Sequence, residues 1–253
     1  MAQARLFLCA LQFMTRLPTS RLDDFQPDWI ARSAPYFPVV GWVVGAVSAA
    51  AFLVASQFWP GLPAAVIAVA AGLLVTGGFH EDGLADTADG LGGGRTSARR
   101  REIMKDSRIG SYGALALWSV LTLKAVLLAS LPPWQGALAL LLIHGAGRAA
   151  APVVMASLTY VRGANEAKLG PSPMAVRPYE AAIAVVLGLA PIVFWPSATQ
   201  AVAGLLLAAI GAGGLALVSR RLIGGFTGDV LGGVEQLAEL GLLLGLTAKV
   251  LAR

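Results

Sequence analysis

The sequence predicts an all-α protein, a polytopic membrane helix bundle with six or seven transmembrane helices. Of the 253 residues, 57% are hydrophobic and 13% are charged, whereas an ordinary soluble domain carries roughly 25% charged residues. Long apolar runs recur along the chain, and no useful length shows the alternation typical of a β-strand. We therefore expect residues 1–253 to form a single integral membrane domain around a central cytoplasmic loop at about 80–111.

Each expected span is an apolar run close to the roughly 20 residues that cross a bilayer as a helix. Gly41 and Gly45 in the first run form a G-x-x-x-G pair, which permits close helix packing. Residues 1–14 are too short to span and predict an interfacial helix, not a cleaved signal peptide. The candidate spans are 36–58, 62–80, 112–131, 136–159, 180–197 and 199–219, with a shorter run at 237–251 as the seventh.

The orientation of the bundle follows from the lysines and arginines. They gather in the N-terminal segment, the central loop, the 160–179 segment (Arg162, Lys168, Arg177) and the 220–236 segment, while the intervening turns carry none. This alternation predicts a cytoplasmic N-terminus and cytoplasmic charged loops. We also expect the acidic residues on that side or at its membrane edge. The net charge of +5 is therefore a topology signal and does not indicate a nucleic-acid partner.

The stretch from Gly77 to Gly113 is a dense polar island between apolar runs. Within it, Asp82, Asp86 and Asp89 stand at i, i+4 and i+7, which places them on one face of a helix. Two such carboxylates at ~4 Å repel each other by roughly 4 kcal/mol at an effective dielectric near 20. A divalent cation removes this cost, and hard oxygen ligands favour Mg²⁺, which in turn suits phosphate substrates. The alternative is a solvated acidic helix end without a ligand.

The end of this stretch carries the sequence Lys105-Asp106-Ser107-Arg108. Basic groups beside an acid are typical of a phosphoryl-transfer site, where the cations neutralise phosphate oxygens and the carboxylate holds a metal or a proton. The nearby run Arg99–Arg101 indicates a cytoplasmic anchor of the topology.

Two basic residues, Lys124 and Arg148, lie inside apolar runs. An ionised side chain at the bilayer centre costs about 2.5–3.5 kcal/mol, so each residue needs an acidic partner, an anionic ligand or a route to the interface. We expect both to point into one cavity that opens toward the cytoplasmic loops. There they would meet phosphate oxygens or the carboxylates of the central stretch.

The glycine-rich segment at 224–233, GGFTGDVLGG, follows Arg220 and Arg221. Its glycines allow the backbone to approach phosphate oxygens, and Asp229 offers a ligand for a metal or a ribose hydroxyl, although such loops also serve as plain turns. Glu239, at the start of the last apolar run, is interpreted as an interfacial carboxylate. His80 is interpreted first as a hydrogen-bonded structural group.

Together these motifs resemble the cobalamin synthase family, adenosylcobinamide-GDP ribazoletransferase. The resemblance is carried by GGFHEDGLADTADG at 77–90 and EIMKDSRIGSYG at 102–113. FMTRLP at 13–18, FPVVGWVVG at 37–45 and GGFTGDVLGG at 224–233 agree in the same order. Lys124 and Arg148 fall where the family places a lysine and an arginine. Relatives can carry a leucine at Glu81, so that residue receives no catalytic role, and Arg101 and Glu235 gain no support.

The resemblance implies an enzyme of the bacterial cytoplasmic membrane with its active site on the cytoplasmic face. It would join adenosylcobinamide-GDP to α-ribazole or α-ribazole 5′-phosphate, release GMP and use Mg²⁺. The implied metal ligands are Asp82, Asp86, Asp89 and Asp106. The implied catalytic residues are these four aspartates together with Lys105 and Arg108. The implied substrate-binding residues are His80, Lys124, Arg148, Gly225, Thr227, Gly228, Asp229 and Glu239.

Two other classes of protein remain open at this point. A phosphotransferase of the CDP-alcohol type shares the Asp86-x-x-Asp89-Gly90 pattern but continues with an Ala-Arg that this chain lacks. A transporter with intramembrane carboxylates is the second alternative, and acids confined to one side favour an enzyme over it. The sequence leaves the oligomeric state open, a homo-oligomer included.

Overall fold

The computed structural model describes residues 3–20, 22, 25–26, 28–161 and 174–249, so Arg162 and Lys168 lie outside the described residues. These ranges contain helices and no β-strand beyond an isolated bridge between Tyr160 and Phe226. The elements are α1 Gln3–Met14, α2 Trp29–Ser33, η1 Ala34–Tyr36, α3 Phe37–Phe58, α4 Leu62–Thr76, α5 Phe79–Gly93, α6 Ser97–Met104, α7 Ser111–Ala129, α8 Pro133–Ser157, α9 Pro178–Leu189, η2 Ala190–Phe194, α10 Ala198–Ile223 and α11 Gly228–Thr247.

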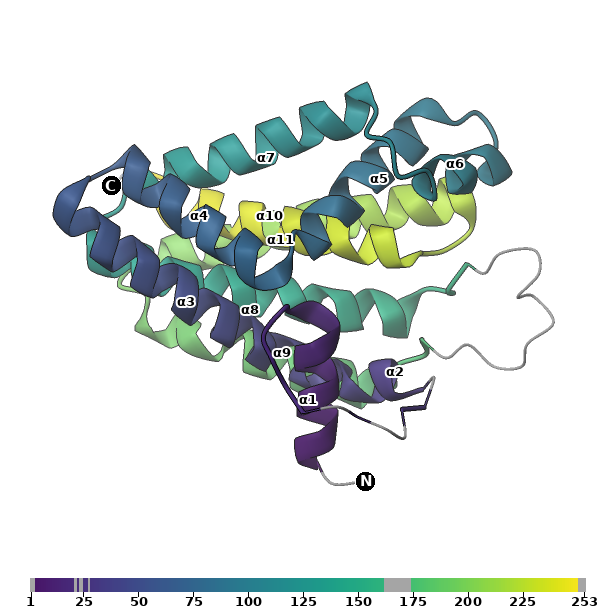
Figure 1. Cartoon of the computed structure of the whole chain (residues 1–253), viewed down its shortest axis with the longest axis horizontal. Coiled ribbons are helices and arrows are strands. Elements are labelled where there is room, and N and C mark those ends of the chain that lie inside the picture. Colours follow the sequence, from purple (N-terminus) through teal and green to yellow (C-terminus); the bar gives the residue numbers. More distant parts are fainter. Residues whose placement is uncertain (1–2, 21, 23–24, 27, 162–173, 250–253) are drawn as a thin grey trace.

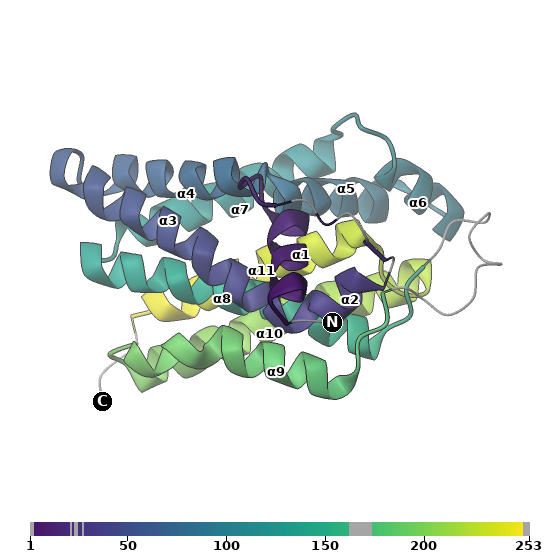
Figure 2. The ribbon, with the colours of Figure 1, turned by 60° about the horizontal axis from the view of Figure 1, so that its bottom comes forward.

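The long helices run side by side along one axis, and α1, with 12 residues, lies across them (Figure 1; Figure 2). The turns between α3 and α4, α7 and α8, and η2 and α10 gather at one end of the bundle. Two segments rich in basic side chains, α5–α6 and the α10–α11 junction, gather at the other end together with the end of α8 (Figure 1). The alternation of charge along the sequence therefore corresponds to two chemically different ends.

The predicted spans agree with the helices, with three differences at their edges. Five helices of the described part are long and apolar enough to cross a membrane, and a sixth span is obtained if α4 and α5 are counted together. The expected span 62–80 ends at Thr76, and the expected span 180–197 is the shorter helix Pro178–Phe194. The seventh run is not a short helix from residue 237, because α11 begins at Gly228.

The break between α4 and α5 determines where the acidic face lies. The two helices meet at an angle of 91°. Gly77 and Gly78 connect them with φ of +70° and +71°, a left-handed backbone that glycine adopts without the steric cost of a side chain. The chain therefore leaves the direction of α4, and α5 carries its aspartates toward the end of the bundle that holds the charged loops (Figure 1).

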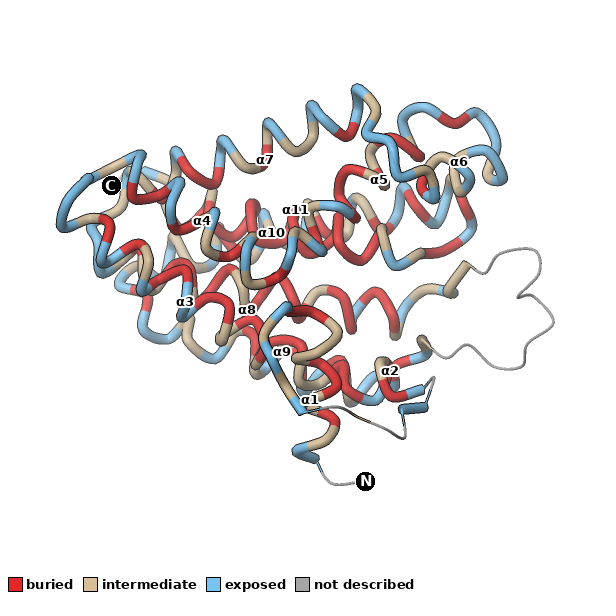
Figure 3. The backbone as a smooth tube through the Cα atoms, in the orientation of Figure 1, coloured by how far each residue is buried: buried red, intermediate tan, exposed pale blue. Residues whose placement is uncertain are grey.

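α11 is the central element of the bundle. In the most apolar stretch of α11, 78% of the residues are buried, compared with 17% in the corresponding stretch of α10. Figure 3 shows the buried residues concentrated inside the bundle. α5 crosses α11 closely, because a Cβ on Gly83 would lie 2.8 Å from the Asp229 carbonyl oxygen. Gly41 and Gly45 pack in the same way on α8, as the G-x-x-x-G pair predicts.

Candidate functional site

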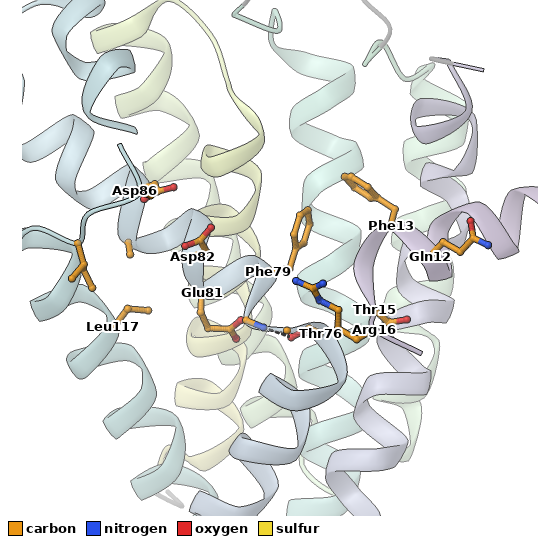
Figure 4. A pocket seen from close by; sticks show the side chains of 15 residues that line it. Gln12, Phe13, Thr15, Arg16, Thr76, Phe79, Glu81, Asp82, Asp86 and Leu117 are labelled. Carbon is orange, nitrogen blue, oxygen red and sulfur yellow. Dashed lines mark hydrogen bonds between the residues drawn. The ribbon is translucent and has the colours of Figure 1, made fainter. Parts of the chain in front are cut away.

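A cleft of about 600 Å³ opens where α5 meets the N-terminal segment (Figure 4). We call it the α1 cleft. It is bounded by the end of α1, the α4–α5 turn, one face of α5, the 107–109 segment and Leu117 of α7. Its lining residues are Gln12, Phe13, Thr15, Arg16, Thr76, Gly77, Gly78, Phe79, Glu81, Asp82, Ala85, Asp86, Ser107, Ile109 and Leu117.

Two of the predicted aspartates, Asp82 and Asp86, face the α1 cleft. Neither forms an ion pair within 4.0 Å with a described basic residue. The carboxylate of Asp86 also lies in the electrostatic field of Asp82, Asp229 and Asp89. The α1 cleft therefore presents two carboxyl groups that pair with no described basic side chain, and their oxygen atoms are the hard donors that a divalent cation prefers.

The third aspartate of the predicted face, Asp89, is buried and has other partners. Its Oδ2 accepts a hydrogen bond of 2.7 Å from the Gly110 N–H, and its Oδ1 accepts one of 2.9 Å from the Gly113 N–H. These donors are at the start of α7, where the first N–H groups have no partner within the helix. Asp89 therefore caps α7 and is not directed into the α1 cleft.

A second cleft, of about 660 Å³, lies between α6 and the start of α11. We call it the α6 cleft. It is lined by Lys105, Thr227, Gly228 and Asp229, together with Arg101, which the sequence analysis interpreted as part of a topology anchor. Thr227 Oγ1 caps α11 by accepting a hydrogen bond from the Val230 N–H. The sequence-predicted loop and Lys105 are thus brought together in one place.

Gly225 has a packing role beside this cleft. A Cβ there would overlap the Thr159 carbonyl oxygen, at a separation of 1.9 Å. The close approach lets Phe226 donate its N–H to that oxygen at 3.0 Å and accept from the Val161 N–H at 2.8 Å. Gly225 therefore joins the segment after α8 to the segment before α11, and it does not line the α6 cleft.

Asp106 and Arg108 pair with each other at the surface. Arg108 Nη2 donates to Asp106 Oδ2 at 2.6 Å, and Arg108 Nε donates to Oδ1 at 3.0 Å. The guanidinium lowers the pKa of Asp106 to about 2. Neither residue lines the α1 cleft or the α6 cleft, so the structure does not bring Asp106 to the other predicted metal ligands.

Beneath the α1 cleft, a buried charge network joins α5, α7, α8 and α11. Lys124 Nζ donates to Glu239 Oε2 at 2.5 Å and to Gln236 Oε1 at 2.7 Å. Arg148 Nη1 lies 3.0 Å from Glu235 Oε1 and 3.4 Å from Glu239 Oε1. The exposed fractions of these five side chains are at most 5%. The members of the network are His80, Glu81, Lys124, His144, Arg148, Glu235, Gln236 and Glu239.

This network corrects two expectations. Glu239 is not an interfacial carboxylate, because it is fully buried. Its Oε2 accepts a hydrogen bond from Lys124 Nζ, and its Oε1 lies 2.7 Å from His144 Nδ1. The acidic residues are accordingly not all at the membrane edge. Lys124 and Arg148 do line one cavity, but that cavity has a volume of only about 20 Å³. Their acidic partners are Glu239 and Glu235 of α11 and not the carboxylates of the central stretch.

His80 is buried at the junction of the network and a small apolar cavity of about 50 Å³. Its Nδ1 lies 3.5 Å from Arg148 Nη2 and 3.9 Å from Glu235 Oε1. These contacts agree with a hydrogen-bonded structural histidine. A direct contact of His80, Lys124, Arg148 or Glu239 with a substrate stays a prediction, since none of them lines the α1 cleft.

Within the described ranges, the closest group of potential metal ligands is His144, Glu235 and Glu239, whose donor atoms lie within 4.8 Å of one another. Lys124 and Arg148 already neutralise these carboxylates, so a cation there would face two positive side chains. The aspartates of the α1 cleft have no such neutralisation. Asp82 and Asp86 therefore remain the more suitable ligands, although they do not form an equally tight group.

Reasoning from sequence gave no site role to four members of the network, Glu81, His144, Glu235 and Gln236. Glu235 and Glu239 stand at i and i+4 on α11, and His144 and Arg148 stand at i and i+4 on α8. Each pair thus lies on one helix face, and each puts charged or titratable groups inside an apolar helix. Taken together, the two pairs were the available signal for His144 and Glu235, whereas Gln236 belongs to neither pair.

Comparison with known proteins shows similarity along almost the whole chain. A family model described as cobalamin-5-phosphate synthase matches residues 6–247. A relative from Leptothrix cholodnii named adenosylcobinamide-GDP ribazoletransferase is 42% identical, covering 98% of this chain and 97% of the relative. Relatives with the same name from Shewanella woodyi and Ralstonia pickettii are 41% and 42% identical, each covering 94% of this chain and 93% of the relative. No solved structure matches the chain.

Proposed function

Because the chain belongs to the cobalamin-5-phosphate synthase family, we propose that it joins adenosylcobinamide-GDP to α-ribazole, or to α-ribazole 5′-phosphate, and releases GMP. The names of the relatives supply the substrates of this transferase of cobalamin synthesis. The observation that carries the proposal within this molecule is the α1 cleft, where Asp82 and Asp86 present unpaired carboxylates beside a basic side chain, Arg16.

The reaction exchanges the phosphoanhydride bond of the GDP group for a phosphate ester bond. A ribose hydroxyl oxygen of the ribazole attacks the phosphorus that is attached to the corrinoid side chain, and the bond from that phosphorus to GMP breaks. The hydroxyl proton is released in the same step, and the attacking and leaving oxygens stand roughly in line. Such a reaction depends on positioning and charge neutralisation, which a cleft between rigid helices provides.

Mg²⁺ fits the residues of this site. Asp82 and Asp86 offer hard oxygen donors whose charge no described basic residue neutralises, and Asp229 adds its field from the start of α11. When bound, the ion supplies neutralisation of phosphate charge. Asp82 and Asp86 would hold it on the α5 face, while the Asp89 cap keeps α7 against that helix.

We place the protein in the bacterial cytoplasmic membrane, in contact with lipid through the outer faces of the bundle. The α6 cleft is lined by residues of α6 and the start of α11, at the end that carries the basic segments, and the 107–109 segment after α6 bounds the α1 cleft. The positive-inside rule assigns these basic segments to the cytoplasm. Both water-soluble substrates would therefore reach the site from the cytoplasm, and the product would leave by the same side.

Purified protein in detergent tests the proposal directly. We expect GMP to appear when adenosylcobinamide-GDP and α-ribazole 5′-phosphate are both supplied, with one corrinoid product formed per GMP. Chelation of divalent metal should stop the reaction, and added Mg²⁺ should restore it. GMP release in the absence of the ribazole acceptor would indicate a hydrolase, and no release with both substrates and Mg²⁺ present would overturn the proposal.

A further inference from the structure

The α1 cleft and the α6 cleft flank the aspartates of α5 and α11 and have no lining residue in common. Asp82 and Asp86 face the α1 cleft and Asp229 faces the α6 cleft, and the charges of Asp82 and Asp229 both act on Asp86. An acidic ridge with a separate cleft on each side suits a reaction between two different phosphate-bearing molecules. The clefts differ in their basic side chains and in their walls.

The α1 cleft contains a single basic lining residue, Arg16. Its backbone is anchored, since the Arg16 N–H donates to the Val75 carbonyl oxygen at 2.7 Å. Its side chain passes over Gly77, where a Cβ would lie 2.5 Å from Arg16 Nε. Figure 4 shows the guanidinium beside Phe79, directed into the cleft. No described carboxylate lies within 4.0 Å of it, so it is available to an anionic ligand.

The walls of the α1 cleft near Arg16 are aromatic and apolar. The rings of Phe13 and Phe79 meet edge to face with centroids 5.1 Å apart, and both line the cleft together with Ile109 and Leu117. A flat aromatic base gains both apolar burial and ring contacts on such a wall. One guanidinium beside an aromatic wall matches a nucleotide with a single phosphate and an apolar base.

The α6 cleft has a different character. It is lined by two basic residues, Arg101 and Lys105, and by the hydroxyl residue Thr227. Its acidic lining residues are Asp229 and Glu102, and Glu102 pairs with Arg99 at 2.8 Å. The charge of Lys105 acts on Asp229 across this cleft. Tyr160 supplies an aromatic ring, which meets Phe226 at 5.5 Å between centroids. Two basic side chains and one aromatic ring match a nucleoside diphosphate better than they match a nucleoside monophosphate.

We propose that the α1 cleft receives the α-ribazole nucleotide with Arg16 on its 5′-phosphate, and that the α6 cleft receives the guanosine diphosphate part of the corrinoid substrate. The assignment rests on the proposed function. It makes Arg16 the residue that distinguishes α-ribazole 5′-phosphate from α-ribazole, because the unphosphorylated acceptor presents no anion to the guanidinium. It also places the diphosphate on the far side of the α5–α11 ridge from the acceptor base.

Steady-state kinetics with the two acceptors tests the role of Arg16. In Arg16→Gln, the KM for α-ribazole 5′-phosphate should rise by about tenfold or more, which corresponds to the loss of about 1.4 kcal/mol of binding. The KM for α-ribazole should rise much less, so the preference for the phosphorylated acceptor should fall. Arg16→Lys, which keeps the charge, should retain part of that preference. Arg32→Gln is the matched control, because this exposed arginine pairs with Asp28 outside both clefts.

The α6 cleft is tested with the other substrate. Lys105→Gln and Arg101→Gln should each raise the KM for adenosylcobinamide-GDP and leave the ratio between the two acceptors at its wild-type value. Equal effects of Arg16→Gln on both acceptors, or an effect on adenosylcobinamide-GDP alone, would overturn the assignment while wild-type turnover still supports the proposed function. Absence of turnover in the wild-type protein would instead defeat the proposed function itself.

Discussion

Asp86 and Asp89 are neighbours on one face of α5 and have different partners. Asp86 lines the α1 cleft without a basic partner, whereas both carboxylate oxygens of Asp89 accept N–H groups at the start of α7. Asp86→Asn should therefore lower turnover by orders of magnitude without lowering the midpoint of thermal unfolding. In Asp89→Asn, the side-chain oxygen can still accept one of the two N–H groups, but the amide nitrogen cannot accept the other. This loss should lower the free energy of unfolding by about 1–3 kcal/mol.

Thermal unfolding in detergent and GMP release, measured on the same preparations, check this contrast. Asp82→Asn serves as the second cleft variant and should behave like Asp86→Asn. If Asp89→Asn were as stable as wild type and yet inactive, Asp89 would be a metal ligand, as the spacing in the sequence predicts.

Lys124 illustrates the cost of a charge inside the bundle. Removal of one partner from a buried ion pair typically costs roughly 3–5 kcal/mol, because the other charge stays buried without compensation. Lys124→Met should therefore destabilise the protein strongly by leaving Glu239 with fewer partners. Lys124→Met combined with Glu239→Gln should recover part of the loss, a coupling that a double-mutant cycle measures. Full stability of Lys124→Met with weakened substrate binding would favour a ligand-binding lysine instead.

At the scale of elements, the crossing of α5 over α11 sets the separation between the two clefts. Gly83→Ala places a methyl group 2.8 Å from the Asp229 carbonyl oxygen, so the helices must move apart. We expect turnover to fall sharply while the stability loss stays near the roughly 1–3 kcal/mol of an overpacked contact. Gly93→Ala is the matched control on the same helix, because its Cβ would be 3.7 Å from Ile103 and in ordinary contact. Similar turnover of both variants would show that the crossing does not position the site.

Most of the helices could be predicted from the sequence, because hydropathy reports burial in lipid one segment at a time. The start of α11 could not, since residues 228–236 contain Asp229 and Glu235 and are less apolar than the run after them. The break before α5 had a signal in Gly77 and Gly78, although paired glycines alone do not specify an angle of 91°.

The candidate site was predictable only in part, for a related reason. Asp82 and Asp86 stood out because their spacing places them on one face, and the structure directs both into the α1 cleft. Asp89 has the same spacing, but its partners are backbone N–H groups 21 and 24 residues away, which no local pattern reveals. The acids that neutralise Lys124 and Arg148 lie on α11, so their pairing depends on how distant helices pack.

At the scale of the whole molecule, the two ends of the bundle should face different compartments. A reporter fused after Pro133, the first residue of α8, should behave as extracytoplasmic, because the turns at that end of the bundle carry no lysine or arginine. A reporter fused after Arg99, within α6, should behave as cytoplasmic. Paired phosphatase and fluorescent-protein fusions measure both positions. The reverse pattern would put both clefts on the wrong side for cytoplasmic substrates.

The central claim is that the α5 aspartates, and not the buried network, hold the divalent cation. The most direct measurement is electron paramagnetic resonance of Mn²⁺, a stand-in for Mg²⁺, titrated with purified protein. We predict that wild-type protein binds Mn²⁺ and that Mg²⁺ competes for the site. The combined Asp82→Asn and Asp86→Asn variant should leave the ion free while the protein stays folded. Wild-type affinity for Mn²⁺ in that double variant would contradict the account and direct attention to His144, Glu235 and Glu239.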